Sequence, residues 1–299
     1  MTLVPFDDRD GFIWWDGALV PWRDAKLHVL SHGLHYASGV FEGERAYSGN
    51  IFRLRDHTDR LINSARILGF ELPFNAEEID AACIETLHAN GLTDAYIRPI
   101  AWRGTEQLAV SAQLTTIHMA IAVWSWPSYF GVDRMQGIRL GMAEWQRPSP
   151  KTAPTAAKAS GLYMIGTLSK HKAEAEGFDD ALMLDWRGHI AEATGANIFF
   201  VKDGVIHTPT PDCFLDGITR RSVISLAKRH QMNVVTRTIL PEELPGFSEV
   251  FLAGTAAEVT PVREIAGMSF TPSDISATLM RDYEHLVRQS PAEVAKLAT

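Results

Sequence analysis

The segment Thr155-Ala156-Ala157-Lys158-Ala159-Ser160-Gly161 places one lysine among small residues, just before a predicted helix and shortly ahead of Tyr163. A lysine with small, apolar neighbours can lose its proton and become a nucleophile, as Schiff-base chemistry requires. Taken alone, the segment is more typical of a surface lysine near a helix start. The segments that follow it decide between these interpretations.

Three downstream segments carry matching features. The run Ile190-Ala191-Glu192-Ala193-Thr194-Gly195-Ala196-Asn197-Ile198 contains one carboxylate, which could keep a pyridine nitrogen protonated. The run Leu215-Asp216-Gly217-Ile218-Thr219-Arg220 begins a predicted helix, and Gly254-Thr255-Ala256-Ala257-Glu258 follows a predicted strand. Such termini offer free backbone N–H groups and a dipole to an anion, for example a cofactor phosphate. Each segment alone is more often a hairpin turn or an ordinary helix cap.

Together with Arg60-Leu61 and the lysine segment, these runs resemble the class IV, fold type IV, pyridoxal 5'-phosphate (PLP) aminotransferases, over roughly residues 10 to 270. The resemblance is strongest to the branched-chain amino acid aminotransferases. Several elements in the right order are far more specific than any one of them. The resemblance implies an α+β fold of two domains, similar to D-amino acid aminotransferase, with the cofactor between the domains.

The resemblance also implies roles for individual residues. Lys158 would bind PLP covalently, Glu192 would pair with the pyridine nitrogen, and Tyr163 would hydrogen-bond the 3'-oxygen. Further cofactor contacts are implied for Arg60, Leu215, Gly217, Ile218, Thr219 and Thr255. The implied substrate positions are Tyr36, Phe41, Gly43, Tyr96, Arg98, Leu108, Val110, Trp126, Tyr129, Ala256 and Ala257.

The implied reaction moves the amino group of L-leucine, L-isoleucine or L-valine to 2-oxoglutarate by a ping-pong mechanism. Arg98 would receive the distal carboxylate of glutamate, while the N–H groups at Ala256 and Ala257 take the α-carboxylate. A D-amino acid or amine transaminase, an aminodeoxychorismate lyase, and a PLP-binding protein without catalysis remain alternatives. Arg98 next to Tyr96 on one side of a predicted strand favours the branched-chain enzyme.

One loop departs from the family pattern. Gln107-Leu108-Ala109-Val110 stands where the family usually has a glycine-rich stretch that reaches into the partner subunit's pocket. Leu108 and Val110 keep the apolar character, but Ala109 restricts a backbone that glycine would leave free. The resemblance therefore implies a homodimer or a multiple of dimers, with substrate breadth in question.

The pattern of the chain predicts a small N-terminal domain over residues 1–127, an interdomain loop over 128–136 and a large PLP-binding domain over 137–299. Asp16-Gly17 predicts a hairpin near the start, and Asn75 with Glu78 predicts a capping box that begins a helix. Strands are expected at about 96–102, 117–126 and 137–145, and a helix at 218–230.

The amino-acid composition limits the ligands and the cellular location that we expect. The net charge is −8, and the basic residues are scattered, so nucleic acid is not an expected ligand. No signal peptide or stretch of about 18 apolar residues is present, and Cys83 and Cys213 form no metal or disulfide motif, which favours the cytoplasm. His32 and His35 lack a third ligand nearby, so we expect structural histidines and no metal.

Overall fold

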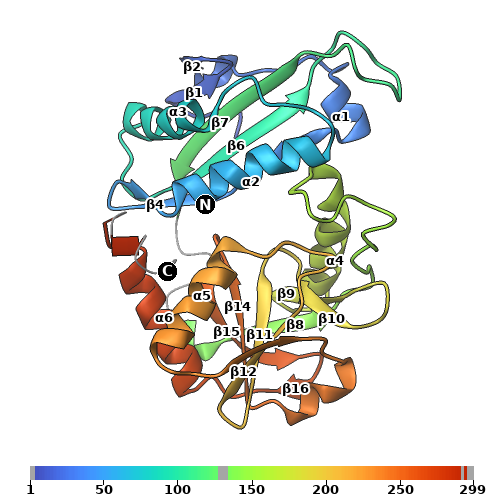
Figure 1. Cartoon of the computed structure of the whole chain (residues 1–299), viewed down its shortest axis with the longest axis vertical. Helices are drawn as coiled ribbons and strands as arrows, with labels where there is room; N and C mark the ends of the chain where they lie inside the picture. Colours follow the sequence, from blue (N-terminus) through green and yellow to red (C-terminus); the bar gives the residue numbers. More distant parts are fainter. Residues whose placement is uncertain (1–3, 127–133, 291–292, 295–299) are drawn as a thin grey trace. The chain divides into compact units, whose positions relative to one another are not determined.

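The computed structural model describes residues 4–126, 134–290 and 293–294. The chain forms two compact units, and each contains its own β-sheet (Figure 1). The first unit comprises Met1–Pro127 and Ala157–Gly161, and the second comprises Ser128–Ala156 and Leu162–Thr299. Each unit mixes helices with a largely antiparallel sheet, as the α+β prediction requires.

The first unit has a seven-stranded sheet in the order β2-β1-β7-β6-β4-β5, with β3 also paired to β6. All of its strand pairs are antiparallel. The predicted hairpin at Asp16-Gly17 is present, and both residues have positive φ, 47° and 104°. The strands are β1 (Phe12–Trp15), β2 (Ala18–Pro21), β3 (Gly39–Phe41), β4 (Glu44–Tyr47), β5 (Asn50–Ile51), β6 (Ala95–Arg103) and β7 (Ile117–Ser125).

Two long helices pack against this sheet (Figure 1). They are α2 (Leu54–Ile67) and α3 (Ala76–Ala89), preceded by the short η1 (Trp22–Asp24) and α1 (His32–Tyr36). The predicted capping box starts α3, since the Asn75 side chain accepts from the Glu78 N–H and the Glu78 carboxylate accepts from the Asn75 N–H. Apolar side chains such as Leu61 and Leu87 are fully buried between helices and strands, which stabilises the unit.

The second unit has a nine-stranded sheet in the order β10-β9-β8-β15-β14-β11-β12-β13, with β16 on β15. Its strands are β8 (Ile138–Met142), β9 (Asp180–Leu184), β10 (Ile190–Ala193), β11 (Asn197–Lys202), β12 (Val205–Pro209), β13 (Val234–Arg237), β14 (Glu249–Gly254), β15 (Glu258–Ile265) and β16 (Met268–Ser269). The helical segments are η2 (Arg134–Gln136), η3 (Ser160–Leu162), α4 (Met164–Ala175), α5 (Ile218–Arg229), η4 (Pro241–Gly246) and α6 (Asp274–Leu286). No helix in the described ranges combines the length and the apolar character that a membrane crossing needs.

The lysine segment lies in the first unit, whereas the sequence-based division put it in the domain of residues 137–299. Backbone contacts explain this placement. Val40 and Ala159 form an antiparallel bridge, and the Phe41 N–H donates to the Lys158 carbonyl at 3.1 Å. The Lys158 N–H in turn donates to Ser64 Oγ on α2 at 3.0 Å. The segment thus extends the edge formed by β3.

Candidate active site

Lys158 has the small, buried neighbours that the sequence indicated. Ala157 is 2% exposed and Ala159 is 4% exposed, while Lys158 itself is partly buried. Its Nζ lies 5.0 Å from the ring centroid of Phe41. The segment therefore holds its backbone rigidly against β3 and α2 and directs a long amine side chain to an aromatic ring.

Arg98 approaches the same ring, with its Cζ 4.9 Å from the Phe41 centroid. Arg98 Nη2 also donates to the Tyr96 hydroxyl at 3.2 Å, because both residues point to one face of β6. Phe41, Tyr96, Arg98 and Lys158, which the resemblance selected separately, are thus neighbours in the first unit. An amine and a guanidinium share one aromatic surface, which suits an anionic substrate that also has an apolar part.

The aromatic wall is larger than the sequence indicated. Trp126 lies 4.8 Å from the Tyr96 ring and Trp124 lies 5.0 Å from it, measured between centroids. Trp124 stands opposite Tyr96 in the pairing of β6 and β7, and it was missed although it precedes Trp126 by two positions on the same strand face. Gly43 makes room for this wall, since a Cβ there would lie 2.0 Å from the Tyr96 hydroxyl.

Arg60 belongs to a buried charge network in the first unit. The Glu42 carboxylate accepts from Arg60 Nε at 2.7 Å, from Arg60 Nη2 at 2.8 Å and from His57 Nδ1 at 2.7 Å. Although burial acts to raise it, the pKa of Glu42 lies well below its ordinary value, because Arg60 attracts the charge and both partners donate hydrogen bonds. Burial lowers the pKa of His57 despite its bond to Glu42. Two nitrogens of the Arg60 guanidinium are thus already bonded to Glu42. The sequence did not predict this contact.

Glu192 lies on β10 in the second unit and is held from two sides. Arg147 Nε is 3.0 Å from its Oε1, and Asn197 Nδ2 donates to its Oε2 at 3.2 Å. All three residues are less than a tenth exposed. A buried carboxylate needs such partners, and Glu192 has a guanidinium beside one oxygen and an amide donor on the other. Neither Arg147 nor Asn197 was identified from the sequence as a site residue.

The helix α5 begins next to this carboxylate. Gly217 is its N-cap, and no side chain caps the helix there. Ile218 and Thr219 form the first turn, and Thr219 Oγ1 lies 3.4 Å from the hydroxyl of the buried Tyr283. The first N–H groups of a helix have no partner within the helix, so this turn is suited to bind a phosphate.

The turn between β14 and β15 contains Thr255, Ala256 and Ala257 and adjoins the same region of the second unit. Gly254 packs on Ala196, since a Cβ at Gly254 would lie 3.1 Å from the Ala196 Cβ. The pairing of β11 with β14 places Asn197 opposite Ala253. The turn therefore lies beside the segment that follows Glu192. Leu215, partly buried, precedes α5 in the same region.

The other residues that the resemblance selected lie at a helix end, are exposed or fall outside the described residues. Tyr163 is the N-cap of α4, where its carbonyl accepts from the Thr167 N–H. Tyr36 on α1 is 46% exposed, and Leu108 and Val110 are 42% and 89% exposed in the loop between β6 and β7. Tyr129 falls outside the described residues.

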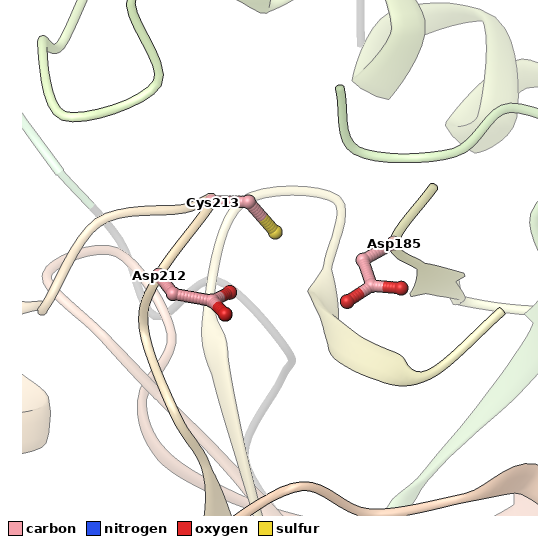
Figure 2. Close-up of side chains that lie close together, drawn as sticks. All are labelled: Asp185, Asp212 and Cys213. Atoms are coloured by element: carbon pink, nitrogen blue, oxygen red, sulfur yellow. The ribbon is translucent and has the colours of Figure 1, made fainter. Parts of the chain in front are cut away.

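A group of metal-ligand type, Asp185, Asp212 and Cys213, lies elsewhere in the second unit, with ligand atoms within 4.8 Å of one another. Figure 2 shows the thiol and the two carboxylates converging from neighbouring loops. Arg187 already supplies a cation there, since its Nη2 donates to Asp185 Oδ2 at 2.6 Å and to Asp212 Oδ2 at 2.8 Å. Burial raises the pKa of Cys213 to about 12, so the thiol is a poor ligand near neutral pH. This cluster is an ion-pair network in which Arg187 already contacts both carboxylates.

Each unit by itself supplies some of the donor types that a phosphorylated pyridine cofactor needs. The first unit offers an amine whose neighbours are small and buried. The second offers a braced, buried carboxylate and an uncapped helix start at a glycine. These residues fit PLP, whose binding requires a lysine, an acid and an anion-binding turn.

Comparison with known proteins agrees with this chemistry. Residues 39–265 match the family Amino-transferase class IV. The branched-chain-amino-acid aminotransferase of Pseudomonas aeruginosa is 44% identical over 87% of this chain and 86% of its own length. The solved branched-chain amino acid aminotransferase of Escherichia coli superimposes with a TM-score of 0.91 at 36% identity, covering 95% of this chain and 97% of that one. A second solved branched-chain amino acid aminotransferase, complexed with N-(5'-phosphopyridoxyl)-L-glutamate, gives 0.90 at 39% identity, covering 95% and 96%.

Proposed function

Because this chain belongs to the class IV aminotransferases, we propose that it uses PLP, bound covalently at Lys158, to move amino groups from branched-chain L-amino acids to 2-oxoglutarate. The fold type IV architecture and the branched-chain aminotransferase activity predicted from the motifs are confirmed by these similarities. The roles of the individual residues are part of the proposal.

The observation that carries the proposal is the shared position of an amine and a guanidinium on Phe41. Lys158 Nζ and Arg98 Cζ lie 5.0 Å and 4.9 Å from the centroid of that ring. A transaminase must hold its nucleophilic amine close to the substrate and must also recognise a second carboxylate. The first unit presents both groups on one aromatic surface.

When bound, PLP supplies an electron sink for the negative charge that develops at the substrate Cα. Lys158 Nζ would take the proton from that Cα as a general base and deliver it to C4' of the cofactor as a general acid, and it would move the proton the opposite way in the second half-reaction. Glu192 would keep a proton on the ring nitrogen, and the guanidinium of Arg147, 3.0 Å away, would hold Glu192 in place. The Tyr163 hydroxyl would donate a hydrogen bond to the 3'-oxygen.

Backbone groups of the second unit and Arg60 would bind the cofactor phosphate and the substrate α-carboxylate. The N–H groups at Ile218 and Thr219 open α5 without a side-chain cap, so they and the Thr255 hydroxyl would hold the cofactor phosphate. Arg60 would add positive charge while Glu42 fixes its guanidinium. The N–H groups at Ala256 and Ala257 would bind the α-carboxylate.

Substrate choice falls to the first unit. Arg98 would pair with the distal carboxylate of glutamate or 2-oxoglutarate, and the phosphopyridoxyl-glutamate complex of the similar solved enzyme supports this use of glutamate. Phe41, Trp126 and the added Trp124 would contact an aliphatic side chain, because Trp124 and Trp126 pack against Tyr96 and the Arg98 guanidinium lies near both Phe41 and Trp124.

We also propose that the chain acts as a homodimer. Leu34, Val110 and Leu114 are 62%, 89% and 77% exposed, an unusual amount of apolar surface around α1 and the loop that follows β6. His32 joins these segments, since its Nε2 donates to the Ala109 carbonyl at 2.8 Å. Sedimentation should show a dimer or a multiple of dimers, and a fully active monomer would refute this part.

A cytoplasmic location fits the two cysteines. Cys83 and Cys213 are both free and buried. Buried thiols without disulfide partners are typical of a reducing compartment.

Spectral titration of the purified holoenzyme with L- and D-amino acids tests the proposal. Leucine, isoleucine, valine and glutamate should each convert the absorbance of lysine-bound PLP into that of pyridoxamine phosphate. Conversion by D-amino acids alone would establish a D-specific transaminase instead. Pyruvate release without an amino acceptor would establish a lyase, and no response to any amine would indicate a binding protein.

A further inference from the structure

Asn197, the first residue of β11, uses its side-chain amide to join three separate parts of the second unit. Its Nδ2 donates to Glu192 Oε2 at 3.2 Å and to the Leu215 carbonyl at 3.0 Å. Its Oδ1 accepts from the Gly217 N–H at 3.2 Å. The side chain is 5% exposed, so water does not compete for these bonds. One amide thus contacts the acid of β10, the segment before α5 and the N-cap of α5.

The orientation of this amide follows from its partners. A carboxylate and a carbonyl can only accept, and a backbone N–H can only donate. Turning the amide over would place Oδ1 against two acceptors and Nδ2 against a donor, so the observed orientation is the one that satisfies all three. Neither aspartate nor leucine, which have similar sizes, offers the same set of donors and acceptor.

The contact with α5 also depends on Gly217. A Cβ at that position would lie 2.2 Å from Asn197 Oδ1, so the amide packs directly on the bare backbone of the N-cap. The pairing of Asn197 with Ala253 of β14 fixes the other side of the residue. The start of α5 is therefore held at a set distance from the sheet by a short, buried side chain.

We infer that Asn197 is a positioning residue that holds the Glu192 carboxylate and the N-terminus of α5 in one arrangement, so that the acid and the phosphate-binding turn fit a single cofactor. The inference rests on the proposed function for the identity of that cofactor. Positioning matters because hydrogen-bonding groups must be held within about 0.5 Å of the productive geometry. Arg147 contacts Oε1 of Glu192 and the Thr194 carbonyl but makes no hydrogen bond to α5 within the described residues, so it cannot replace Asn197.

Binding measurements on the apoenzyme separate the two ends of the site. Inorganic phosphate tests the α5 end alone, pyridoxal tests the ring end without a phosphate, and PLP tests both. For Asn197→Ala we expect each ligand to bind more weakly, PLP by roughly tenfold or more, which corresponds to about one or two hydrogen bonds. Asn233→Ala, an exposed asparagine of the same unit, is the matched control and should bind all three as wild type does.

Asn197→Asp sharpens the test because it keeps an acceptor for the Gly217 N–H but replaces the donor that faces Glu192. At low pH the neutral carboxyl can donate to Glu192 and accept from the Gly217 N–H, so we expect phosphate and pyridoxal to bind nearly as to wild type. As the pH rises and the introduced carboxyl ionises, both should bind more weakly relative to wild type, because the carboxylate repels the phosphate at the N-terminus of α5 and can no longer donate to Glu192. A residue that only stabilises the fold would not produce this pH dependence.

Unchanged binding of all three ligands to a folded Asn197→Ala variant would overturn the inference. If that variant does not fold, Asn197→Asp decides alone, and losses that do not change with pH would be the contrary result. A wild-type protein that binds neither PLP nor pyridoxal would instead overturn the proposed function.

Discussion

The two units recognise their proposed ligands with different kinds of groups. The first unit uses long side chains, with Arg98 and Lys158 both lying against the ring of Phe41. The second unit uses backbone at the start of α5 and one short acid, Glu192, which is braced by its neighbours. Long side chains suit a site that must accept both a charged and an aliphatic substrate, whereas fixed backbone suits a cofactor that does not change. The contrast suggests that substitutions in the first unit alter substrate choice and those in the second alter cofactor binding.

The largest expected effect comes from Lys158→Ala, which removes both the covalent anchor and the base that moves the Cα proton. Transamination of leucine should fall by roughly 10⁴-fold or more. Lys151→Ala changes an exposed lysine earlier in the chain and serves as the control. Steady-state assays with leucine and 2-oxoglutarate measure the effect. Activity of Lys158→Ala within about tenfold of wild type would refute the role of Lys158 as anchor and base.

Glu192→Gln tests the second unit, because it keeps the shape of the side chain but removes the charge that faces Arg147. PLP should still bind, since the α5 turn is unchanged, but Cα deprotonation should slow by about 10² to 10³-fold without a charge to retain the ring proton. Single-turnover absorbance changes with leucine measure this step. The exposed Glu176→Gln is the control, and a normal rate in Glu192→Gln would place the acid elsewhere.

Arg98→Met separates the two substrates within the first unit. It removes a charge-assisted contact but keeps an apolar stem, so glutamate should lose roughly tenfold to a hundredfold in its half-reaction, about 1.5 to 3 kcal/mol. Leucine, isoleucine and valine should lose much less, because Phe41, Trp124 and Trp126 remain. Pre-steady-state half-reactions with glutamate and leucine, run separately, measure the difference, with the exposed Arg66→Met as the control. Equal losses would assign Arg98 to the α-carboxylate, and a larger loss for leucine would refute the role.

The sequence alone predicted the turns and helix starts that depend on residues adjacent in the chain. The turn at Asp16-Gly17 and the capping box of Asn75 and Glu78 are determined by residues next to each other in the chain, and both are present. The start of α5 at Ile218 agrees with the predicted helix start for the same reason. The family resemblance then supplied the site residues that local patterns could not select.

The rest depends on contacts between distant residues, which leave no pattern in one sequence. Lys158 joins the first unit through Val40, Phe41 and Ser64, which lie far earlier in the chain. Arg147 lies far earlier in the chain than Glu192 and contacts it only in the folded structure, whereas Asn197 lies five residues after Glu192 and its contact was missed within the motif itself. Trp124 could have been identified from the sequence, because it lies two positions before Trp126 and side chains alternate along a strand.

Glu44 differs from the paired buried acids Glu42 and Glu192, and it gives the smallest but most direct test of how the molecule holds a buried acid. Unlike Glu192, Glu44 on β4 is 0% exposed, and neither of its carboxylate oxygens has a hydrogen-bond partner among the described residues. Burial raises its pKa well above the ordinary value of 4.5, and Glu42 and Asp80 add to the increase while Arg60 opposes it. Glu44 is therefore held as the neutral acid in the folded protein.

Because the folded pKa of Glu44 is raised, the unfolded chain releases this proton at a lower pH than the folded chain does. Its contribution to stability is fully present below the unfolded value of 4.5 and is lost as the pH rises toward the folded pKa. Glu44→Met keeps the length of the side chain but removes the acid, so it should increase the free energy of unfolding near neutral pH by on the order of 1 kcal/mol. The gain should shrink as the pH falls toward the unfolded pKa. Urea unfolding across this pH range, with the exposed Glu85→Met as the control, measures it. A gain that does not change with pH would mean that packing, and not the buried proton, causes the difference between glutamate and methionine at position 44. A loss of stability at every pH would show that Glu44 has a partner in the folded protein.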